Sequence, residues 1–371
     1  MIRLAKVIAT FETDFLAQYR NRLTPAHYRA LAAIKQCRTD ASRQMQAQCT
    51  ECDHQKRVPH SCGHRHCPHC QHHESQQWLE RQLKKQVPAE YFLLTFTLPA
   101  EFRALIWAHQ SVVYELLMRC GWETVRTFSH NDKQLQGPPG AIAVLHTNTR
   151  RMEFHPHVHL VMPAAALDDK QKRWRTKRRG KTKAGYLFNH KALAKVFRAK
   201  MLAAIKAAGL TLPQQHPETW VVDCKSVGSG EKALIYLGRY LYRGVIAEKD
   251  IVACGNGQVS FRYRNAKTGT IEFRTEPGAH FLWLVLQHVL PKGFRRARNF
   301  GFLHPNCKRL IALLHLILKF DPAAAVCWFK KRAPILCTCC GAVMVIVKTK
   351  LRSVLHGAVA APIVTHGAAT V

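Results

Sequence analysis

The segment LHTNTRRMEFHPHVHLVMP, residues 145–163, decides how the central part of the chain folds. Strand-like residues flank a polar stretch, Thr149–Glu153, on both sides. This pattern predicts two antiparallel strands, Ile142–Asn148 and Phe154–Met162, which that stretch joins as a turn. The central region is therefore expected to contain a β-hairpin.

The spacing of histidines in this hairpin points to a metal site. Because alternate residues of a strand share a face, His157 and His159 point the same way and Val158 is buried on the opposite side. Two imidazoles on one face can hold a divalent ion that polarises a phosphate oxygen. A third ligand is then expected, and His146 on the preceding strand is the first choice, ahead of Asn148. The alternative is that these histidines are ordinary polar residues of a hairpin.

A predicted helix over residues 232–245 carries two candidate nucleophiles. Tyr236 and Tyr240 are four residues apart, so they lie one above the other on one helix face. An arginine follows each tyrosine three residues later, at Arg239 and Arg243. A neighbouring cation can stabilise a phenolate or the charge on a phosphorus transition state. The alternative is an aromatic stripe that packs into a core.

The fourteen cysteines cluster along the chain, which indicates metal binding rather than scattered buried thiols. Cys49-Thr-Glu-Cys52 and Cys67-Pro-His-Cys70 form two CxxC knuckles with fourteen residues between them. Each knuckle turns tightly, so both of its thiolates can face one ion, and two knuckles complete a closed tetrahedral site. We therefore expect one structural zinc ion, with the ligands Cys49, Cys52, Cys67 and Cys70.

Other residues of ligand type leave the pairing open. Cys37, Cys62 and His66 lie before and between the two knuckles, where they could form part of a second site or replace one of the expected ligands. A third CxxC, Cys337-Thr-Cys-Cys340, resembles half of a zinc ribbon. Its second half is not evident unless Cys327 and a histidine serve.

The net charge of the 371-residue chain is +33, and its pI is near 10.1. So large an excess calls for a polyanionic partner; nucleic acid is the usual one and a membrane surface is the alternative. No apolar run approaches the ~18–20 residues of a membrane-spanning helix. Residues 1–16 also lack the apolar stretch of a signal peptide. We expect a cytoplasmic, nucleoid-associated protein without a membrane partner.

Positive charge is most concentrated in the segment KQKRWRTKRRGKTK, residues 170–183, where nine of fourteen residues are Lys or Arg. The segment closely follows the histidine-bearing strand, which favours contact with phosphates; the alternative is a solvated loop. An unpaired base could stack on the tryptophan. The expected DNA-binding residues are Arg173, Trp174, Arg175, Arg178 and Arg179.

Composition divides the chain into three regions. Residues 1–88 are rich in Cys and His, and residues 89–250 alternate strand-like and helix-like segments. Residues 251–371 combine a small β segment, an apolar helix, a basic stretch and a Cys-rich end. We expect a zinc-binding and DNA-binding domain, then a catalytic domain, then a basic carboxy-terminal region.

Six segments together resemble one protein family. They are SCGHRHCPHCQ (61–71), FTLPAEFR (96–103), LHTNTRRMEFHPHVHLVMP (145–163), YLGRYLYRG (236–244), FRYRNAKTG (261–269) and HVLPKGFRRARNFGFL (288–303). Over most of its length the chain resembles the rolling-circle insertion-sequence transposases of the two-tyrosine HUH class. Replication initiators and relaxases share the strand motif, the His-hydrophobic-His pair and the tyrosine, but not the amino-terminal zinc module.

The resemblance implies an α+β fold: an antiparallel sheet flanked by helices, of the RNA-recognition-like HUH endonuclease type, with a small amino-terminal zinc-binding domain. It implies that Tyr236 and Tyr240 cleave single-stranded DNA at element ends, leaving a 5′-phosphotyrosine and a free 3′-hydroxyl. The expected ions are structural Zn²⁺ and catalytic Mg²⁺ or Mn²⁺.

Two other functions compete with this interpretation. A replication initiator or relaxase would use the same chemistry, but the zinc module and the second tyrosine argue against it. A non-catalytic zinc-dependent DNA-binding protein would account for the charge and the cysteines. It would not account for the helix that carries tyrosine and arginine pairs.

Overall fold

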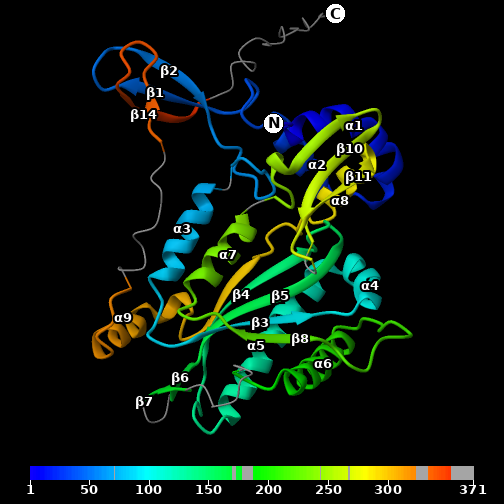
Figure 1. The fold of residues 1–371 in the computed structure, drawn as a ribbon, viewed down its shortest axis with the longest axis vertical. Coiled ribbons are helices and arrows are strands. Elements are labelled where there is room, and N and C mark those ends of the chain that lie inside the picture. Colours follow the sequence, from blue (N-terminus) through cyan, green and yellow to red (C-terminus); the bar gives the residue numbers. More distant parts are fainter. Residues whose placement is uncertain are drawn as a thin grey trace, which may run out of the picture.

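The computed structural model describes residues 1–70, 72–168, 173–177, 187–242, 244–265, 268–322 and 333–351. A central sheet lies between helices, a smaller helical and β unit lies beyond one end of it, and a narrow β ribbon projects farther out (Figure 1). Within these ranges, none of the helices combines the length and the apolar character that crossing a membrane requires.

The central sheet has the strand order β12–β4–β5–β3–β8, and every neighbouring pair is antiparallel. Helices cover both of its faces, so the expected α+β architecture with an antiparallel sheet is confirmed. The strands are β3 (Tyr91–Thr97), β4 (Gly140–Asn148), β5 (Phe154–Pro163), β8 (Val222–Ser226) and β12 (Ala297–Gly301).

The predicted hairpin is confirmed as the pair β4 and β5. In its register, His146 lies opposite His157 and Val144 lies opposite His159. Val158 is fully buried in the core on the other face, as the alternation along a strand requires. The sheet therefore separates an apolar face from a face that carries the histidines.

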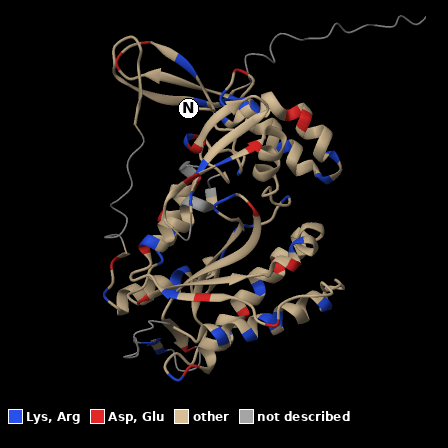
Figure 2. Cartoon of the chain, turned by 45° about the vertical axis from the view of Figure 1, so that its right-hand side comes forward, with Lys and Arg blue, Asp and Glu red and all other residues tan. Residues whose placement is uncertain are grey.

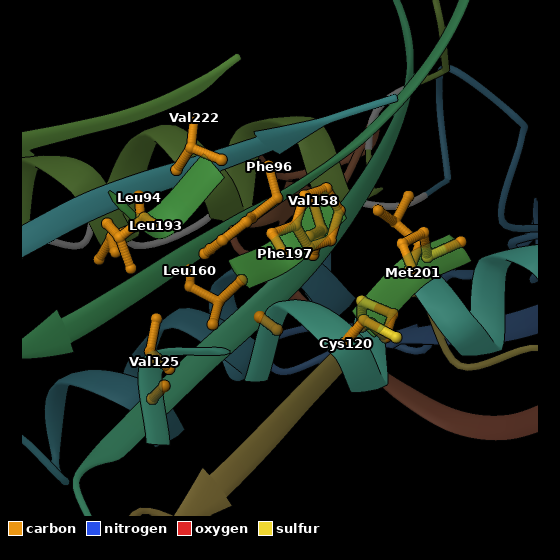
Figure 3. Close-up of a cluster of buried hydrophobic side chains, with 14 of the residues drawn as sticks. Leu94, Phe96, Cys120, Val125, Val158, Leu160, Leu193, Phe197, Met201 and Val222 are labelled. Carbon is orange, nitrogen blue, oxygen red and sulfur yellow. The ribbon is translucent and has the colours of Figure 1, made fainter. Parts of the chain in front are cut away.

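The apolar face is covered by α5 (Gln110–Asn131) and α6 (His190–Ala207). Large side chains from the sheet and both helices interlock there (Figure 3). Fully burying each such side chain stabilises the fold by about 1.5–3 kcal/mol. Residues labelled in the figure include Leu94, Phe96, Cys120, Val158, Leu160, Phe197 and Met201.

The histidine-bearing face is covered by α3 (His72–Leu83), α7 (Glu231–Tyr242) and α9 (Lys308–Ile317). Alternate sheet residues pack against apolar residues of these helices, and α3 lies along α7. This second core holds α7 over the strands that carry the histidines. Its sheet residues are Tyr91, Leu93, Ile142, Val144 and Val161.

A separate unit joins the two amino-terminal helices to residues 251–286. Gly278 marks the contact, because an added Cβ there would lie 2.3 Å from the ring of Phe11. A larger residue would push the two helices that carry these positions apart. The elements of this unit are α1 (Leu4–Tyr19), α2 (Pro25–Gln36), α8 (Gly278–Leu286), β9 (Ile251–Gly255), β10 (Gln258–Arg264) and β11 (Ile271–Pro277).

A four-stranded ribbon is built from both ends of the described chain, in the order β13–β14–β1–β2. Its strands are β1 (Gln44–Cys49), β2 (Gln55–Pro59), β13 (Ile335–Leu336) and β14 (Val343–Leu351). The remaining elements are α4 (Arg103–Ala108) and the strand pair β6 (Ala165–Asp168) and β7 (Arg173–Thr176), with short 3-10 turns between elements.

The three regions expected from composition do not coincide with three packing units. The central sheet takes its edge strand, β12, from beyond residue 250. The amino-terminal helices pack on α8, and β1 pairs with β14. Composition shows where the types of residue along the chain change. Packing depends on which apolar surfaces come into contact.

Candidate active site

Three histidines converge on the face of the sheet beneath α7. One ring nitrogen from each of His146, His157 and His159 lies within 4.8 Å of the others, and we call these residues the histidine cluster. The ring centroids of His146 and His159 are 4.5 Å apart, and those of His157 and His159 are 4.8 Å apart. The structure thus brings together the two histidines of the strand motif and the first-choice third ligand.

Strand register explains this convergence. His157 and His159 are two residues apart on β5, and His146 faces His157 directly across β4. Opposite residues of an antiparallel pair have Cβ atoms about 4.5–5.5 Å apart, so three side chains on one face must meet. The alternative candidate, Asn148, lies one residue beyond a register shift and donates a hydrogen bond to the carbonyl of Thr149.

Hydrogen bonds orient two of the three rings. Nδ1 of His157 donates to the carbonyl oxygen of His155 at 2.7 Å. Nδ1 of His159 lies 2.9 Å from the hydroxyl of Thr95. Each contact occupies Nδ1 and leaves Nε2 to bind an ion, which is how the partners of metal-ligating histidines usually act. Thr95 was not singled out by the sequence, since only strand pairing places it beside His159.

Burial keeps the histidine cluster neutral. Desolvation lowers the pKa of His157 to about 4 and that of His159 to about 3, and it holds the pKa of His146 well below its usual range. Neighbouring imidazoles add to the effect on His146 and His159. Neutral imidazole is the form that ligates a metal, so this set of donors fits a divalent ion.

Tyr236 of α7 faces the histidine cluster. Its ring centroid is 6.4 Å from that of His146 and 6.4 Å from that of His159. The side chain remains 38% exposed, although Leu234 and Leu237 beside it are fully buried. A tyrosine in this position can reach both the cluster and a ligand from solvent.

The second tyrosine and the two arginines lie partly outside the description. Position 240 falls within α7, but the side chains of Tyr240 and Arg239 are outside the described part of the chain, as is the whole of Arg243. The structure therefore places Tyr236 of these four residues.

Helix α3 holds α7 in place. Ser75 of α3 donates a hydrogen bond to the carbonyl oxygen of Gly238 at 2.8 Å. The ring of Trp78 lies 3.4 Å from where a Cβ on Gly238 would be. Glycine at this position lets α3 and α7 pack closely within one turn of Tyr236.

A half-buried arginine connects the tyrosine helix to the strand that carries His146. Nε of Arg296 donates to the carbonyl oxygen of Leu145 at 2.9 Å, and its guanidinium also reaches the carbonyl oxygen of Leu241 at 3.4 Å. Burial lowers the pKa of Arg296 to about 10, so the side chain is still cationic at neutral pH. Sequence reasoning did not select Arg296, although it lies in the segment 288–303 that carries part of the resemblance.

The expected four-cysteine site is not formed by the residues that the sequence predicted. Cys67 and Cys70 lie with Cys37 and Cys62, which we call the first cysteine cluster. Cys49 and Cys52 instead lie with Cys337 and Cys340, which we call the second cysteine cluster.

The physical reason is the length of chain between the two knuckles. After Cys52 the chain runs through β2, whose five residues extend about 17 Å at 3.3 Å per residue. This strand carries Cys67 and Cys70 away from the ribbon and toward the end of α2. Cys327, the other partner considered for the third CxxC, lies outside the described residues.

The first cysteine cluster has the geometry of a closed thiolate site. Sγ of Cys37 lies 3.2 Å from that of Cys70 and 3.4 Å from that of Cys67. The backbone N–H of Cys62 donates to Sγ of Cys70 at 3.4 Å. His66 is not part of this cluster, because its Nε2 accepts a hydrogen bond from the backbone N–H of Leu290 at 3.3 Å.

Of the basic segment at 170–183 the structure describes residues 173–177, and these lie away from the histidine cluster. From His157, β5 runs six residues to Pro163, about 20 Å at 3.3 Å per residue, before β6 and β7 begin. Arg173 is exposed. Trp174 is half-buried and packs edge-on against Phe302 with ring centroids 5.4 Å apart.

Among the other expected DNA-binding residues, Arg175 forms an ion pair with Asp168 at 3.2 Å. Arg178 and Arg179 lie outside the described residues.

A second basic surface surrounds a cleft of about 930 Å³ between α5 and the segment 292–305. Lys292, Arg295 and Arg298 line the cleft, and Arg298 forms an ion pair with Glu115. Lys and Arg occur in all parts of the molecule in this view (Figure 2), and the sequence has 56 of them against 23 Asp and Glu. The three cations that line the cleft therefore come from the same segment of the chain as Arg296.

Comparisons with known proteins show the family of this chain. Residues 140–310 match a family model described as "Putative transposase", and residues 7–98 match one described as "Transposase zinc-binding domain". The protein "Putative transposase y4qJ" of Sinorhizobium fredii (strain NBRC 101917 / NGR234) is 31% identical over 324 residues, which are 81% of this chain and 80% of that protein.

Two further comparisons extend this set. The "Transposase for insertion sequence element IS801" of Pseudomonas savastanoi pv. phaseolicola is 27% identical over 327 residues, which are 79% of this chain and 76% of that protein. Among solved structures, the conjugative relaxase TrwC in complex with mutant OriT DNA matches 35% of this chain at 17% identity, with a TM-score of 0.26. This match spans 48% of the relaxase chain.

Proposed function

Because this chain belongs to the rolling-circle insertion-sequence transposases of the two-tyrosine HUH class, with their amino-terminal zinc-binding domain, we propose that it cuts and rejoins single-stranded DNA at element ends. The proposed intermediate is a 5′-phosphotyrosine. A DNA transposase acts on the chromosome, so the proposed location is the cytoplasm, in association with the nucleoid.

One observation carries this proposal. The phenol ring of Tyr236 lies 6.4 Å from the rings of His146 and His159, on the exposed side of the histidine cluster. At this separation of the rings, a phosphate group held by an ion on the imidazoles would be within reach of the tyrosine side chain. A purely structural tyrosine would not need a neutral, buried donor set beside it.

A bound Mg²⁺ or Mn²⁺ would withdraw charge from the scissile phosphate. A phenol in water has a pKa of about 10, so the hydroxyl of Tyr236 must lose its proton as it attacks phosphorus. The bond from phosphorus to the 3′ oxygen breaks as the new bond from phosphorus to the tyrosine oxygen forms, and the 3′ oxygen leaves as a hydroxyl once protonated. One phosphodiester replaces another, so rejoining needs no external energy source.

We assign Tyr240 as the second nucleophile and Arg239 and Arg243 as the cations that stabilise the phosphorus charge. This assignment rests on helix spacing, because residues four apart share a helix face. Two nucleophiles would let one tyrosine hold the donor strand while the other cuts again. Such an exchange suits strand transfer better than simple nicking.

The first cysteine cluster is proposed to bind a structural Zn²⁺. Four thiolates saturate a tetrahedral ion and leave no position open for water or phosphate, so this ion would not take part in cleavage. Its contribution is to hold the loop that packs beside α7. His69 Nε2 lies 2.7 Å from Glu248 Oε2, and Glu248 Oε1 accepts from the backbone N–H of Leu4, so this loop is also tied to α1.

The function is tested by incubating purified protein with labelled single-stranded DNA that carries element-end sequences, in the presence of Mg²⁺ or Mn²⁺. Denaturing gels should show a cleaved strand whose 5′ side carries a protease-sensitive adduct. Tyr236→Phe should abolish the first cleavage, and a His157→Ala and His159→Ala double variant should abolish cleavage while DNA binding remains.

Tyr242→Phe is the matched control. It lies on the same helix but about 120–160° around the axis from the two proposed nucleophiles, so cleavage should continue. Binding without any cleavage or adduct in the wild-type protein would favour the non-catalytic DNA-binding interpretation instead.

A further inference from the structure

The second cysteine cluster draws its residues from the two ends of the chain. Cys49 and Cys52 lie in the amino-terminal knuckle, and Cys337 and Cys340 lie almost three hundred residues later. The family models match residues 7–98 and 140–310, so both later cysteines fall outside the matched regions. We propose that this cluster is a second structural zinc site, which fastens the carboxy-terminal strands to the amino-terminal ribbon.

The distances between sulfur atoms fit one tetrahedral ion. With metal–sulfur bonds of about 2.3 Å, the sulfur atoms of a tetrahedral zinc site lie about 3.8 Å apart. Sγ of Cys52 lies 3.8 Å from that of Cys337 and 3.6 Å from that of Cys340, and Sγ of Cys49 lies 3.4 Å from that of Cys340. A disulfide would require a separation of about 2.05 Å, and none of these pairs is bonded.

The backbone around the cluster forms two equivalent knuckles. The N–H of Glu51 donates to Sγ of Cys49 at 3.4 Å, and the N–H of Cys339 donates to Sγ of Cys337 at the same distance. Such bonds stabilise a thiolate in each half. Gly341, with a φ of 75°, provides the left-handed residue that turns the second knuckle back into β14.

Backbone bonds also hold the two knuckles against each other. The N–H of Thr50 donates to the carbonyl oxygen of Val343 at 3.1 Å, and the hydroxyl of Thr50 donates to the same oxygen at 3.0 Å. Thr338 Oγ1 lies 3.2 Å from Nε2 of His54. The four sulfur atoms are therefore brought together by contacts from both chain ends and do not depend on one strand pair alone.

The ribbon has little else to hold it together. Its buried apolar cluster consists of Ala47, Cys49, Cys337 and Met344, so half of this small core is metal-ligand cysteine. Several β14 side chains stay exposed, including Val345 and Val347 at 48% and 45%. A sheet this small gains too little from burial to offset the entropy of ordering it, and structural metal normally supplies the difference.

The chemistry of the donor set selects zinc among the common metals. Four thiolates in a closed tetrahedral arrangement suit Zn²⁺, and tetrahedral iron is the competing possibility. Among the described residues, the cluster consists of four cysteines and includes no carboxylate. The bound ion would join two segments that are separated in the chain by the whole central sheet. It would also hold β14 against β1, so that this edge of β1 could not pair with another chain.

Metal content of the full-length protein tests the site. Cys337→Ser and Cys340→Ser should each lower the zinc content by one ion per chain relative to the wild type. Cys339→Ser is the matched control, because this exposed thiol lies in the same knuckle but outside the cluster, and its zinc content should not change. An unchanged zinc content in Cys337→Ser, or iron in place of zinc, would overturn the proposal.

A second experiment measures whether the metal site holds the carboxy-terminal strands to the rest of the protein. A protease recognition site placed between residues 323 and 332 allows the full-length protein to be cut after folding. The carboxy-terminal fragment should then co-elute with the remainder in gel filtration. In the Cys337→Ser and Cys340→Ser double variant the fragment should separate while the remainder still elutes as a folded protein. Retention of the fragment in the double variant would show that strand pairing alone holds it, against the proposal.

This inference does not depend on the proposed cleavage chemistry, since neither test measures cleavage.

Discussion

Nδ1 of His159 and the hydroxyl of Thr95 lie 2.9 Å apart across the paired strands β5 and β3. This contact engages one nitrogen of the imidazole and leaves the other to face His146 and His157. Thr95 is therefore a positioning residue: it sets the orientation of a proposed ligand and need not touch the DNA.

Replacing Thr95 with valine should weaken metal binding without changing the shape of the site. Loss of an outer partner of a ligating histidine typically costs about 10–100-fold in metal affinity or activity. The concentration of Mn²⁺ that gives half-maximal cleavage should rise accordingly, and saturating Mn²⁺ should restore most of the rate. Thr95→Ser keeps the hydroxyl and should behave like the wild type. An unchanged metal requirement in Thr95→Val would show that the contact does not orient the ring.

Replacing Arg296 with lysine should disturb both stability and cleavage. Lysine cannot donate to the carbonyl oxygens of Leu145 and Leu241 in the same fork, and each acceptor that stays unsatisfied costs about 1–3 kcal/mol. Chemical denaturation should report a loss of that order, and cleavage should slow because α7 shifts relative to β4. Arg295→Lys, next to it but exposed, is the control and should change neither. Equal stability of the two variants would contradict the connecting role.

Changing Arg173, Arg175, Arg178 and Arg179 together to alanine should weaken DNA binding and flatten its dependence on salt. Each phosphate contact to single-stranded DNA contributes a slope of roughly −0.7 in the logarithm of affinity against the logarithm of salt concentration. Because Arg175 already pairs with Asp168, the change should be smaller than four contacts would give. Cleavage of DNA already bound should continue, since none of the four arginines is a proposed metal ligand or nucleophile.

The cleft residues provide the comparison for this experiment. A Lys292→Ala and Arg295→Ala double variant removes two cations that line the cleft beside α5. If both side chains contact phosphates of the DNA, the salt slope should fall by roughly 1.4. The quadruple variant could keep the full wild-type slope while the double variant shows a reduced one. This result would show that the cleft residues contact the DNA phosphates and that the 170–183 segment is a solvated loop.

Acid should destabilise the protein through histidines that are buried outside the histidine cluster. Burial lowers the pKa of His288 from 6.5 to about 4, and His27 shows the same shift for the same reason. The unfolded chain then binds more protons than the folded chain between these values, so stability falls as the pH drops from about 6.5 toward 4. A shift of this size corresponds to about 3 kcal/mol for a fully buried group.

Denaturation curves at pH 7 and pH 5 measure this effect. His288→Gln should reduce the loss of stability between the two pH values, because the variant has one fewer group to protonate on unfolding. His130→Gln alters an exposed histidine at the end of α5 and should leave the loss unchanged. The same pH dependence in His288→Gln and in the wild type would assign the acid sensitivity to other groups.

Several parts of the fold and the site could be predicted from sequence because they depend on neighbouring residues. The β4–β5 hairpin follows from local alternation, and the shared face of His157 and His159 follows from the period of two along a strand. The helix that carries Tyr236 follows from a period of 3.6. The longest of these features, the hairpin, spans residues 140–163.

The partners of these elements could not be predicted in the same way. Thr95 and Arg296 contact the histidine strand only because β3 and the segment before β12 pack on either side of the hairpin. Trp174 was selected for its ability to stack on a base, and only the fold shows that its ring packs edge-on against Phe302, which lies more than one hundred residues away in the chain.

The cysteines show most clearly the difference between what a local sequence pattern predicts and what long-range packing decides. The spacing of a CxxC knuckle determines locally that two thiolates face one ion, and all three knuckles take part in four-cysteine clusters. Which knuckle joins which ligands is decided by where β2 carries the chain and by the pairing of β1 with β14. By itself, the sequence determined that the protein has ligand pairs, a histidine face and a tyrosine helix. Only the tertiary structure decided how these meet, because contacts between distant segments depend on the packing of the whole chain and not on local period.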